Sequence, residues 1–365
     1  MHKIGLISSH GGLNGAAKMV ETLARGLADQ GHQVRLYHRE GAWLAQQSLP
    51  ESVDLRPVDI GVRMLNKAEI SRVRAELLDW GAACLHSHGT SADRFNGCVR
   101  LDGQLAGVAT AHARVLHLHW RKHDLVIAPS NYTLAWYQKL RLVRHGRSCV
   151  IANAMDKNAI CPIEPEQIQP LRAELGLPGN KFLILMIGTV TERKNQSAAI
   201  PILSELISRG VDADLVVVGQ GNGKEAAKLQ RLADSKGLRE RVHLLGQRSD
   251  IGAYVGASNL VLSTSRDEQA SVSLIETLAG GRTAVSSDVG SAREVVRDGS
   301  TGMVFNLNNT APATDFIVQC ASDPAFARRC NIAARQSFED NLTTPSFVKA
   351  HVAAYEVAVE RNSQR

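Results

Sequence analysis

Short apolar segments alternate along this chain with glycine-containing turns and stretches of helical period, and this alternation constrains the fold more than any other feature. In the first half it predicts a strand over Lys3–Ser8, a turn over Gly11–Gly15, a helix over Ala16–Gln30 and a strand over Gln33–Tyr37. In the second half we expect strands over Lys181–Ile187, Asp214–Val218, Val242–Leu245, Leu260–Ser263 and Ala284–Ser287, and helices over Gln196–Arg209 and Gly223–Lys236. The alternation indicates an α/β protein whose parallel sheets carry helices on both faces.

The length of 365 residues corresponds to about two domains. The densest proline cluster lies near the middle of the chain and consists of Pro162, Pro165, Pro170 and Pro178. We therefore predict an N-terminal domain over 1–165 and a C-terminal domain over 166–345. We expect the remaining segment, 346–365, to form a helix that packs back on the N-terminal domain.

Composition excludes several classes of protein. No apolar run approaches the roughly 18 residues of a membrane helix, and the N-terminus lacks a signal-peptide pattern, so we expect a cytoplasmic protein. The six cysteines form no C-x-x-C pair, which favours reduced, buried thiols over zinc or disulfides. The aromatic fraction of 4% and the net charge of +6 argue against nucleic acid and are compatible with an anionic substrate or an acidic membrane surface.

Two glycine-rich loops follow predicted strands, where ligands of parallel sheets bind. The first contains Gly15 at a helix start, and the other is Val218–Gly223, which contains Gly219. Glycine leaves backbone N–H groups open to an anion such as phosphate. A flexible strand–helix turn explains each loop equally well.

Arg193 and Lys194 stand in a third loop, which follows the buried strand at Lys181–Ile187. Two adjacent cations suit a diphosphate, because arginine offers a flat fork of donors and lysine a compact charge. Solvated charges at a helix start are the alternative. Cations near a helix N-terminus are unfavourable unless an anion joins them, which favours the diphosphate.

Glu268 and Glu276 follow the strand Leu260–Ser263 and lie about two helical turns apart. Glu276 falls near an apolar helix face, where a carboxylate needs partners such as a ribose diol. Glu268, expected at the start of this helix, could orient a second polyol. One capping acid and one ordinary helix glutamate are the alternative.

His112 follows a predicted short strand and lies in a histidine-rich region. A metal site there is disfavoured because carboxylates at ligand spacing are lacking. We expect His86 and His88 to belong to a loop rather than to a metal site. The same half carries a basic stretch that could bind a phosphate-bearing glycan or membrane headgroups, with a solvated helix face as the alternative: Arg114, Arg121, Lys122, Lys139, Arg141, Arg144 and Arg147.

These motifs together resemble the retaining, nucleotide-sugar-dependent glycosyltransferases of the GT-B fold, group 1 or family 4-like. The resemblance is carried by Glu268-x7-Glu276, Asp288-Val289-Gly290 and Asp298-Gly299-Ser300-Thr301-Gly302, and by Asn14-Gly15 with the helix that follows. It implies two facing Rossmann-like domains with parallel sheets and a cleft between them, the first for the acceptor and the second for the donor.

The resemblance also implies residue roles. Glu276 would hold the donor ribose, and Glu268 with the backbone of Gln269, Ala270 and Ser271 would hold the transferred sugar. Lys194 and Arg193 would neutralise the diphosphate, Gly15 would allow close backbone approach, and His112 would contact the sugar. The catalytic residues would then be His112, Glu268 and Lys194.

The implied activity is transfer of a hexose, from a UDP-sugar by preference, to a glycan or lipid-linked acceptor in polysaccharide or lipopolysaccharide synthesis. We expect the protein to use no metal or other cofactor and to bind no nucleic acid. Peripheral contact with the cytoplasmic face of a membrane is compatible with this activity. Thr189 and Gln269-Ala270-Ser271 depart from the family pattern. The alternative is therefore a non-catalytic module that binds nucleotide or glycan. The absence of G-x-G-x-x-G disfavours a nicotinamide oxidoreductase.

Overall fold

The computed structural model describes residues 2–61, 66–100, 103–179, 181–221 and 223–364. The chain divides into two compact units. The first unit is the chain up to Ala154 together with the segment from Thr344 onward, and the second unit runs from Met155 to Thr343. This boundary lies earlier than the proline cluster suggests. Ile160 and Ile163 explain the difference, because they pack against glycines of helix α8 (Ile251–Ala257) and so belong with the second unit.

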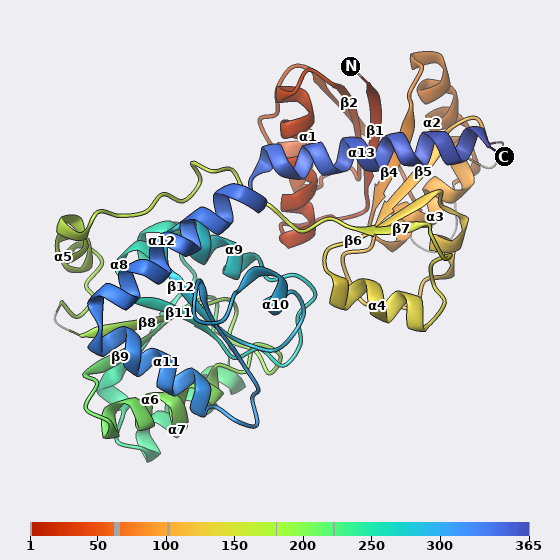
Figure 1. Ribbon diagram of the computed structural model, residues 1–365. Helices are drawn as coiled ribbons and strands as arrows, with labels where there is room; N and C mark the ends of the chain where they lie inside the picture. Colours follow the sequence, from red (N-terminus) through yellow and green to blue (C-terminus); the bar gives the residue numbers. More distant parts are fainter. Residues whose placement is uncertain (1, 62–65, 101–102, 180, 222, 365) are drawn as a thin grey trace. The chain divides into compact units, whose positions relative to one another are not determined.

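The first unit is built on one parallel sheet of strand order β3-β2-β1-β4-β5-β6-β7 (Figure 1). The strands are β1 (Lys3–Ser8), β2 (Gln33–His38), β3 (Val53–Pro57), β4 (Cys84–His88), β5 (Ala106–Thr110), β6 (Leu125–Ala128) and β7 (Ser148–Val150). The helices are α1 (Gly15–Asp29), α2 (Lys67–Trp80), α3 (Thr90–Val99), α4 (Asn131–Lys139) and α13 (Thr344–Ser363), with short 3-10 helices at Trp43–Gln46 and Leu118–Lys122.

Side chains of β1 alternate between two cores, as the period of a strand requires. Ile4 and Leu6 pack into the core that includes Leu23 of α1 and residues of α13. Ile7 packs into the core on the other face, which includes residues of α2 and α3. Gly26 lets α13 approach α1 closely, because a Cβ atom there would lie 2.6 Å from Val348 Cγ2.

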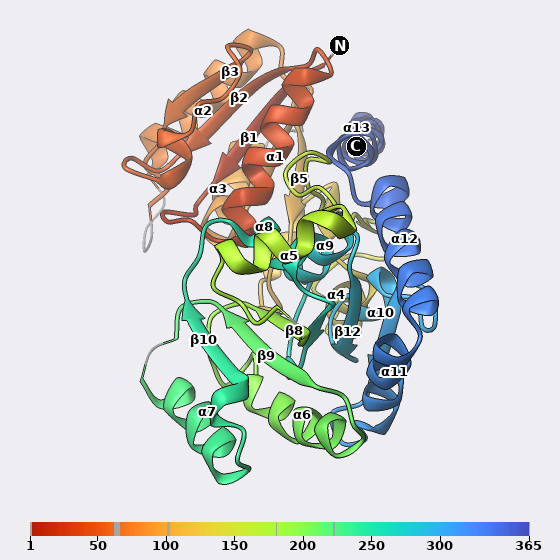
Figure 2. The same cartoon turned by 90° about the vertical axis from the view of Figure 1, so that its left-hand side faces the viewer.

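The second unit contains a parallel sheet of order β10-β9-β8-β11-β12-β13, and Figure 2 shows β10, β9 and β8 side by side. Its strands are β8 (Phe182–Ile187), β9 (Ala213–Val218), β10 (Val242–Gly246), β11 (Leu260–Ser263), β12 (Thr283–Ser287) and β13 (Gly302–Phe305). Its other helices are α5 (Pro165–Glu174), α6 (Ala199–Ser208), α7 (Lys224–Ser235), α9 (Val272–Ala279), α10 (Ala292–Val295), α11 (Ala311–Ser322) and α12 (Pro324–Asn341), with 3-10 helices at Gln196–Ala198 and Arg239–Arg241.

Both sheets reverse their strand order once, between β1 and β4 in the first unit and between β8 and β11 in the second. Ligands of open parallel sheets bind at the carboxyl ends of the strands beside such a reversal. The loops after these four strands are therefore the places where a binding site is expected.

Three expectations from the sequence are wrong. His86 and His88 belong to the buried strand β4 and not to a loop. Helix α9 begins at Val272, so Glu268 lies in the preceding loop and not at a helix start. Cys161 is exposed, whereas Cys84, Cys320 and Cys330 are buried as expected. Within the described residues, no helix has both the length and the apolar composition that crossing a membrane requires.

Candidate functional site

The loops after β8 and β11 are joined by hydrogen bonds in the second unit. The side-chain amide of Asn195 donates to the carbonyl of Thr264 (3.2 Å), and the hydroxyl of Thr264 donates to the carbonyl of Asn195 (2.8 Å). The backbone N–H of Arg266 donates to the carbonyl of Arg193 (2.8 Å). These bonds fix the cations of the first loop against the acidic residues of the second.

Glu268 lies at the centre of this junction. Its Oε1 atom is 2.6 Å from Lys194 Nζ, and its Oε2 atom is 2.9 Å from Arg193 Nη1. The hydroxyl of Ser265 donates to Oε1 (3.1 Å). Burial acts to raise the pKa of Glu268, but the two neighbouring cations outweigh it and hold that pKa below the usual value. Glu268 is therefore a buried, ionised carboxylate, and we call Arg193, Lys194 and Glu268 the charge cluster.

Glycines shape the backbone beside the charge cluster. Gly188 has φ of +130°, and a Cβ atom there would lie 3.2 Å from Cε of Lys194, so the lysine stem lies along this glycine. A Cβ atom at Gly219 would lie 2.1 Å from the carbonyl oxygen of Gly188. Only glycine fits at 219, because the obstructing atom belongs to the backbone. Asn222, in the same loop as Gly219, lies outside the described residues.

Gly290 supports the charge cluster from the loop after β12. It has φ of +58°, and a Cβ atom there would lie 2.5 Å from the carbonyl oxygen of Glu268. Next to it, Ser291 Oγ accepts a hydrogen bond from the backbone N–H of Ser271 (3.3 Å). Ser265 and Ser291 were not predicted from the sequence as part of the site. The Asp288-Val289-Gly290 motif was the signal that this loop matters.

The other predicted donor residues lie in or just before α9. Gln269 and Ala270 are half-buried, and Ser271 is buried at the N-terminus of this helix. Glu276 lies one turn into α9 and is half-buried beside the buried residues Ile275 and Thr277. The structure thus joins Glu268, Lys194 and Arg193 by direct ion pairs, and it places Glu276 on the helix that follows.

Predicted residues of the first unit lie at the carboxyl ends of other strands. Gly15 is exposed at the first position of α1. Asn14 is the N-cap of this helix, and its side chain accepts a hydrogen bond from the backbone N–H of Ala17 (2.9 Å). His112 follows β5 and is half-buried. Its Nε2 atom lies 2.9 Å from Nδ1 of His88, the last residue of β4. From the sequence His88 was expected in a loop, and its contact with His112 was not predicted, although histidines two apart in a strand share one face of a sheet.

His112 and His88 belong to a row of histidine side chains. The ring of His10 meets that of His112 edge-on at 5.9 Å, and the rings of His88 and His86 are 4.2 Å apart. His86 also contacts the hydroxyl of Tyr355 (2.8 Å). Burial lowers the pKa of His112 to about 3 and the pKa of His88 well below its usual value. These histidines are therefore neutral near pH 7.

The charge cluster combines one carboxylate, from Glu268, with the two cations Lys194 and Arg193. Both cations point at the carboxylate that a metal would need as a ligand. Among the described residues, no group of three or more histidine, cysteine, aspartate or glutamate side chains could hold a metal.

Comparisons with known proteins point to one family. Residues 167–337 match the family model described as Glycosyl transferases group 1, and residues 13–159 match Glycosyltransferase Family 4. The N-acetyl-alpha-D-glucosaminyl L-malate synthase of Bacillus anthracis is 24% identical over 51% of this chain and 48% of its own length. The lipopolysaccharide core biosynthesis mannosyltransferase LpcC of Rhizobium leguminosarum bv. viciae is 28% identical over 57% of each chain. The chain thus spans about half the length of these curated relatives.

Solved structures show the same fold. Anabaena Alr3699/HepE, in complex with UDP, superposes with a TM-score of 0.84 at 18% identity over 97% of this chain and 99% of that one. A glycosyltransferase from Rickettsia africae superposes with a TM-score of 0.84 at 17% identity over 98% and 99%. The chain forms two Rossmann-like units with parallel sheets, and two glycosyltransferase family models match most of its sequence. This chain therefore belongs to the group 1 glycosyltransferases of the GT-B fold.

Proposed function

We propose that this protein transfers a hexose from a nucleoside-diphosphate sugar, by preference a UDP-sugar, to a glycan or lipid-linked acceptor with retention of anomeric configuration. The observation that carries the proposal is the charge cluster at the strand reversal of the second unit. A parallel sheet offers its ligand site at that position, and two fixed cations there suit a diphosphate.

The chemistry follows from charge. When the bond between the anomeric carbon and the diphosphate oxygen breaks, its electron pair stays on the oxygen, and positive charge develops on the sugar. Lys194 and Arg193 would stabilise the departing diphosphate, and Glu268 would face the sugar side and orient its hydroxyls. Fixed charges of this kind typically lower a barrier by several kcal/mol. Because these cations neutralise the diphosphate, we expect transfer to need no metal ion.

The remaining roles come from the family. Glu276 would accept the two ribose hydroxyls, and the N–H groups near Gln269, Ala270 and Ser271 would bind the transferred sugar. UDP is our preferred donor nucleotide because Alr3699/HepE has been solved with UDP, and with UDP-glucose. Relatives in lipopolysaccharide core synthesis support a glycan or lipid-linked acceptor.

Release of nucleoside diphosphate from UDP-, GDP- and ADP-sugars tests the proposal. We expect release with one nucleotide class, unchanged by EDTA, and reduced at least a hundredfold by Lys194→Gln. The matched control is Lys228→Gln, which changes a half-exposed lysine of α7. If UDP binds but no sugar nucleotide is ever consumed, the non-catalytic binding module is correct. If EDTA abolishes release and Mg²⁺ restores it, metal independence is wrong.

The 3-10 helix Leu118–Lys122 favours peripheral contact of the first unit with an anionic membrane. Leu116 and Leu118 are 78% and 67% exposed, and Arg121 and Lys122 follow on the same segment. Exposed leucines beside cations suit an interface of acyl chains and acidic headgroups. Co-sedimentation with phosphatidylglycerol vesicles should fall for the double variant Leu116→Ser and Leu118→Ser. Equal sedimentation with phosphatidylcholine vesicles would contradict the role of charge.

A further inference from the structure

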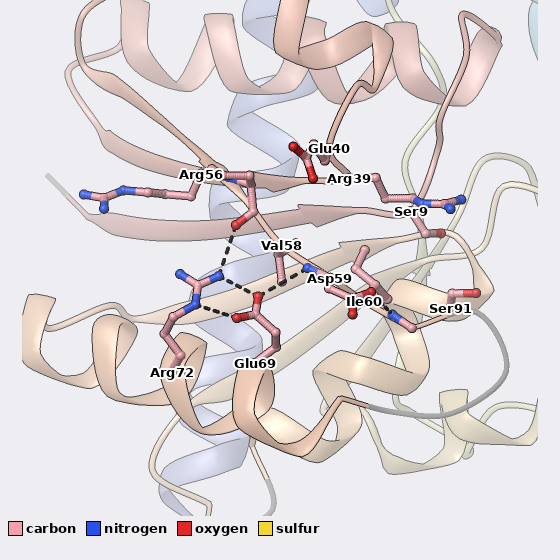
Figure 3. A pocket seen from close by; sticks show the side chains of 12 residues that line it. Ser9, Arg39, Glu40, Arg56, Val58, Asp59, Ile60, Glu69, Arg72 and Ser91 are labelled. Atoms are coloured by element: carbon pink, nitrogen blue, oxygen red, sulfur yellow. Dashed lines mark hydrogen bonds and ion pairs between the residues drawn. The ribbon is translucent and has the colours of Figure 1, made fainter.

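Two hollows of the first unit differ in character. One, of about 640 Å³, has a wall on which charged side chains such as Arg72 and Glu69 pair with each other (Figure 3). It lies at the carboxyl ends of the strands in the unit that the family assigns to the acceptor, so it belongs with the function already proposed. The other hollow, of about 360 Å³, lies along β7 and α13, and the proposed function does not use it. We call it the β7–α13 groove.

The β7–α13 groove exists because β7 is the edge strand of its sheet and one of its faces is only partly covered. Helix α4 covers the opposite face, where Tyr137 packs with Val126 and Ala128 of β6. On the side of the groove lies α13, which Figure 1 shows running across the sheet. Val348 of α13 packs closely against Gly26 of α1. The helix is thus held toward α1 and leaves a gap on its other side, along β7.

The lining of this groove is apolar apart from one hydroxyl and one cation. It comes from β6, from β7 with the residue that follows it, and from one face of α13: Leu125, Ser148, Cys149, Val150, Ile151, Ala350, Ala353, Ala354, Val357 and Arg361. Burial raises the pKa of Cys149 to about 11, so its thiol is neutral near pH 7 and adds to the apolar wall. Val357 is 38% exposed although it faces this wall. A ligand that covers these side chains would remove apolar surface from water.

Arg361 brings an unmatched charge to one end of the groove. Side chains of a helix lean toward its N-terminus, so Arg361 extends back over the turn that holds Val357. Its Nη1 atom is buried and has no hydrogen-bond partner among the described residues. The described side chains that line the groove include no carboxylate. Buried donors normally have an acceptor, and an anionic group of a ligand would supply one here with a charge-assisted bond.

The dimensions of the groove suit a single alkyl chain. A helix rises about 1.5 Å per residue, so Ala350 and Arg361 lie roughly 16 Å apart along α13. An extended chain of about a dozen carbons has this length. We propose that the β7–α13 groove binds a fatty-acid anion, with its carboxylate on Arg361 and its alkyl chain along Ala353 and Val357. This site goes beyond the proposed glycosyl transfer and does not depend on it.

Calorimetric titration of the whole chain with dodecanoate, dodecanol and butanoate separates the role of the charge from that of the alkyl chain. One dodecanoate should bind per protein chain, dodecanol should bind about tenfold more weakly, and butanoate should give no detectable binding. Arg361→Gln should lower the affinity for dodecanoate about tenfold and leave that for dodecanol unchanged. Ala353→Phe, which fills the groove from an exposed position, should weaken the binding of both. The matched control is Arg328→Gln, which changes an exposed arginine of α12 and should alter neither affinity.

Equal affinities for dodecanoate and dodecanol, or dodecanoate binding that neither Arg361→Gln nor Ala353→Phe weakens, would overturn this inference. It would also be wrong if phosphatidylglycerol vesicles bound in an Arg361-dependent manner and monomeric dodecanoate did not, because the groove would then be a membrane contact. Unchanged urea unfolding of the variants, followed by tryptophan fluorescence, excludes loss of the fold as the cause of weaker binding. Release of nucleoside diphosphate is a separate measurement, so a failure of the transferase proposal leaves this site standing.

Discussion

Nδ1 of His88 lies 2.9 Å from Nε2 of His112, and this contact determines the tautomer of both rings. Nε2 of His88 is buried and has no hydrogen-bond partner among the described residues. Buried N–H groups without an acceptor are rare, so this nitrogen carries the lone pair. Neutral His88 then holds its proton on Nδ1 and donates it to His112, whose own proton must lie on Nδ1.

We therefore predict that His88 positions His112 as a hydrogen-bond donor toward the sugar. His88→Leu removes the bond and should lower kcat for nucleoside diphosphate release about tenfold to a hundredfold, with little change in KM. His88→Asn keeps a donor at the δ position and should retain most of the activity. Nitrogen-15 correlation spectra should show the proton of His112 on Nδ1 in the native protein and a mixture in His88→Leu. Wild-type kcat in His88→Leu would refute this role.

The histidine row shows what the sequence could and could not reveal. Strand β1 and the fold class follow from local apolar patterns, and they are predicted correctly. Strand β4 was missed because Cys84-Leu85-His86-Ser87-His88 lacks β-branched residues and reads as polar. It forms a strand because its backbone pairs with both β1 and β5. Its polar residue His86 is satisfied there by Tyr355 and Thr110, and Tyr355 is 269 positions away in the sequence. Local patterns carry no information about such partners.

A second prediction concerns Glu268, which forms ion pairs with Lys194 and Arg193 and offsets one of their two charges. Glu268→Gln should lower turnover at least a hundredfold, because the sugar loses its carboxylate partner. The same change should make UDP bind more tightly, because both cations become available to the diphosphate. The matched control is Glu192→Gln in the loop of the two cations, where the carboxylate is 77% exposed. Calorimetric titration shows whether the affinity for UDP rises or falls. Weaker UDP binding to Glu268→Gln would contradict the proposed placement of the diphosphate.

The three residues of the charge cluster were predicted from the sequence, but the ion pairs that join them were not. The sequence suggested that adjacent cations near a helix start need an anion, and a ligand was the expected anion. In the structure, Glu268 supplies that charge from a loop whose backbone is bonded to the cation loop. The spacing to Glu276 wrongly suggested one continuous helix. A loop conformation set by Gly290 and Ser291 cannot be deduced from helical period alone.

A third prediction uses two glycines with positive φ as a matched pair. Gly290→Ala should lower the stability of the second unit by more than 2 kcal/mol, because backbone strain adds to a clash with the carbonyl of Glu268. Gly299 also has positive φ, of +72°, but an added Cβ atom there meets nothing within 4 Å. Gly299→Ala should therefore cost only about 1 kcal/mol. Scanning calorimetry measures both, and equal losses would contradict the tight contact at Gly290.

The fourth prediction is that acid destabilises the first unit through its histidine row. Burial lowers the pKa of His351 to about 4, and the pKa values of His86, His88 and His112 are lowered as well. Below about pH 6.5 the unfolded chain binds protons that the folded chain does not, so stability falls as pH decreases through this window. For His351 alone, the loss between pH 7.5 and 5.5 is about 1 kcal/mol.

Tryptophan fluorescence isolates this effect, because all four tryptophans, Trp43, Trp80, Trp120 and Trp136, lie in the first unit. Urea unfolding should give a lower free energy of unfolding at pH 5.5 than at pH 7.5. His351→Leu should reduce the difference between these two free energies by about 1 kcal/mol. This difference is the relevant quantity, because the substitution also changes packing equally at both pH values. His145→Gln, which changes an exposed histidine, should leave the difference intact. If His351→Leu also leaves it intact, His351 is protonated in the folded protein and its burial does not keep it neutral.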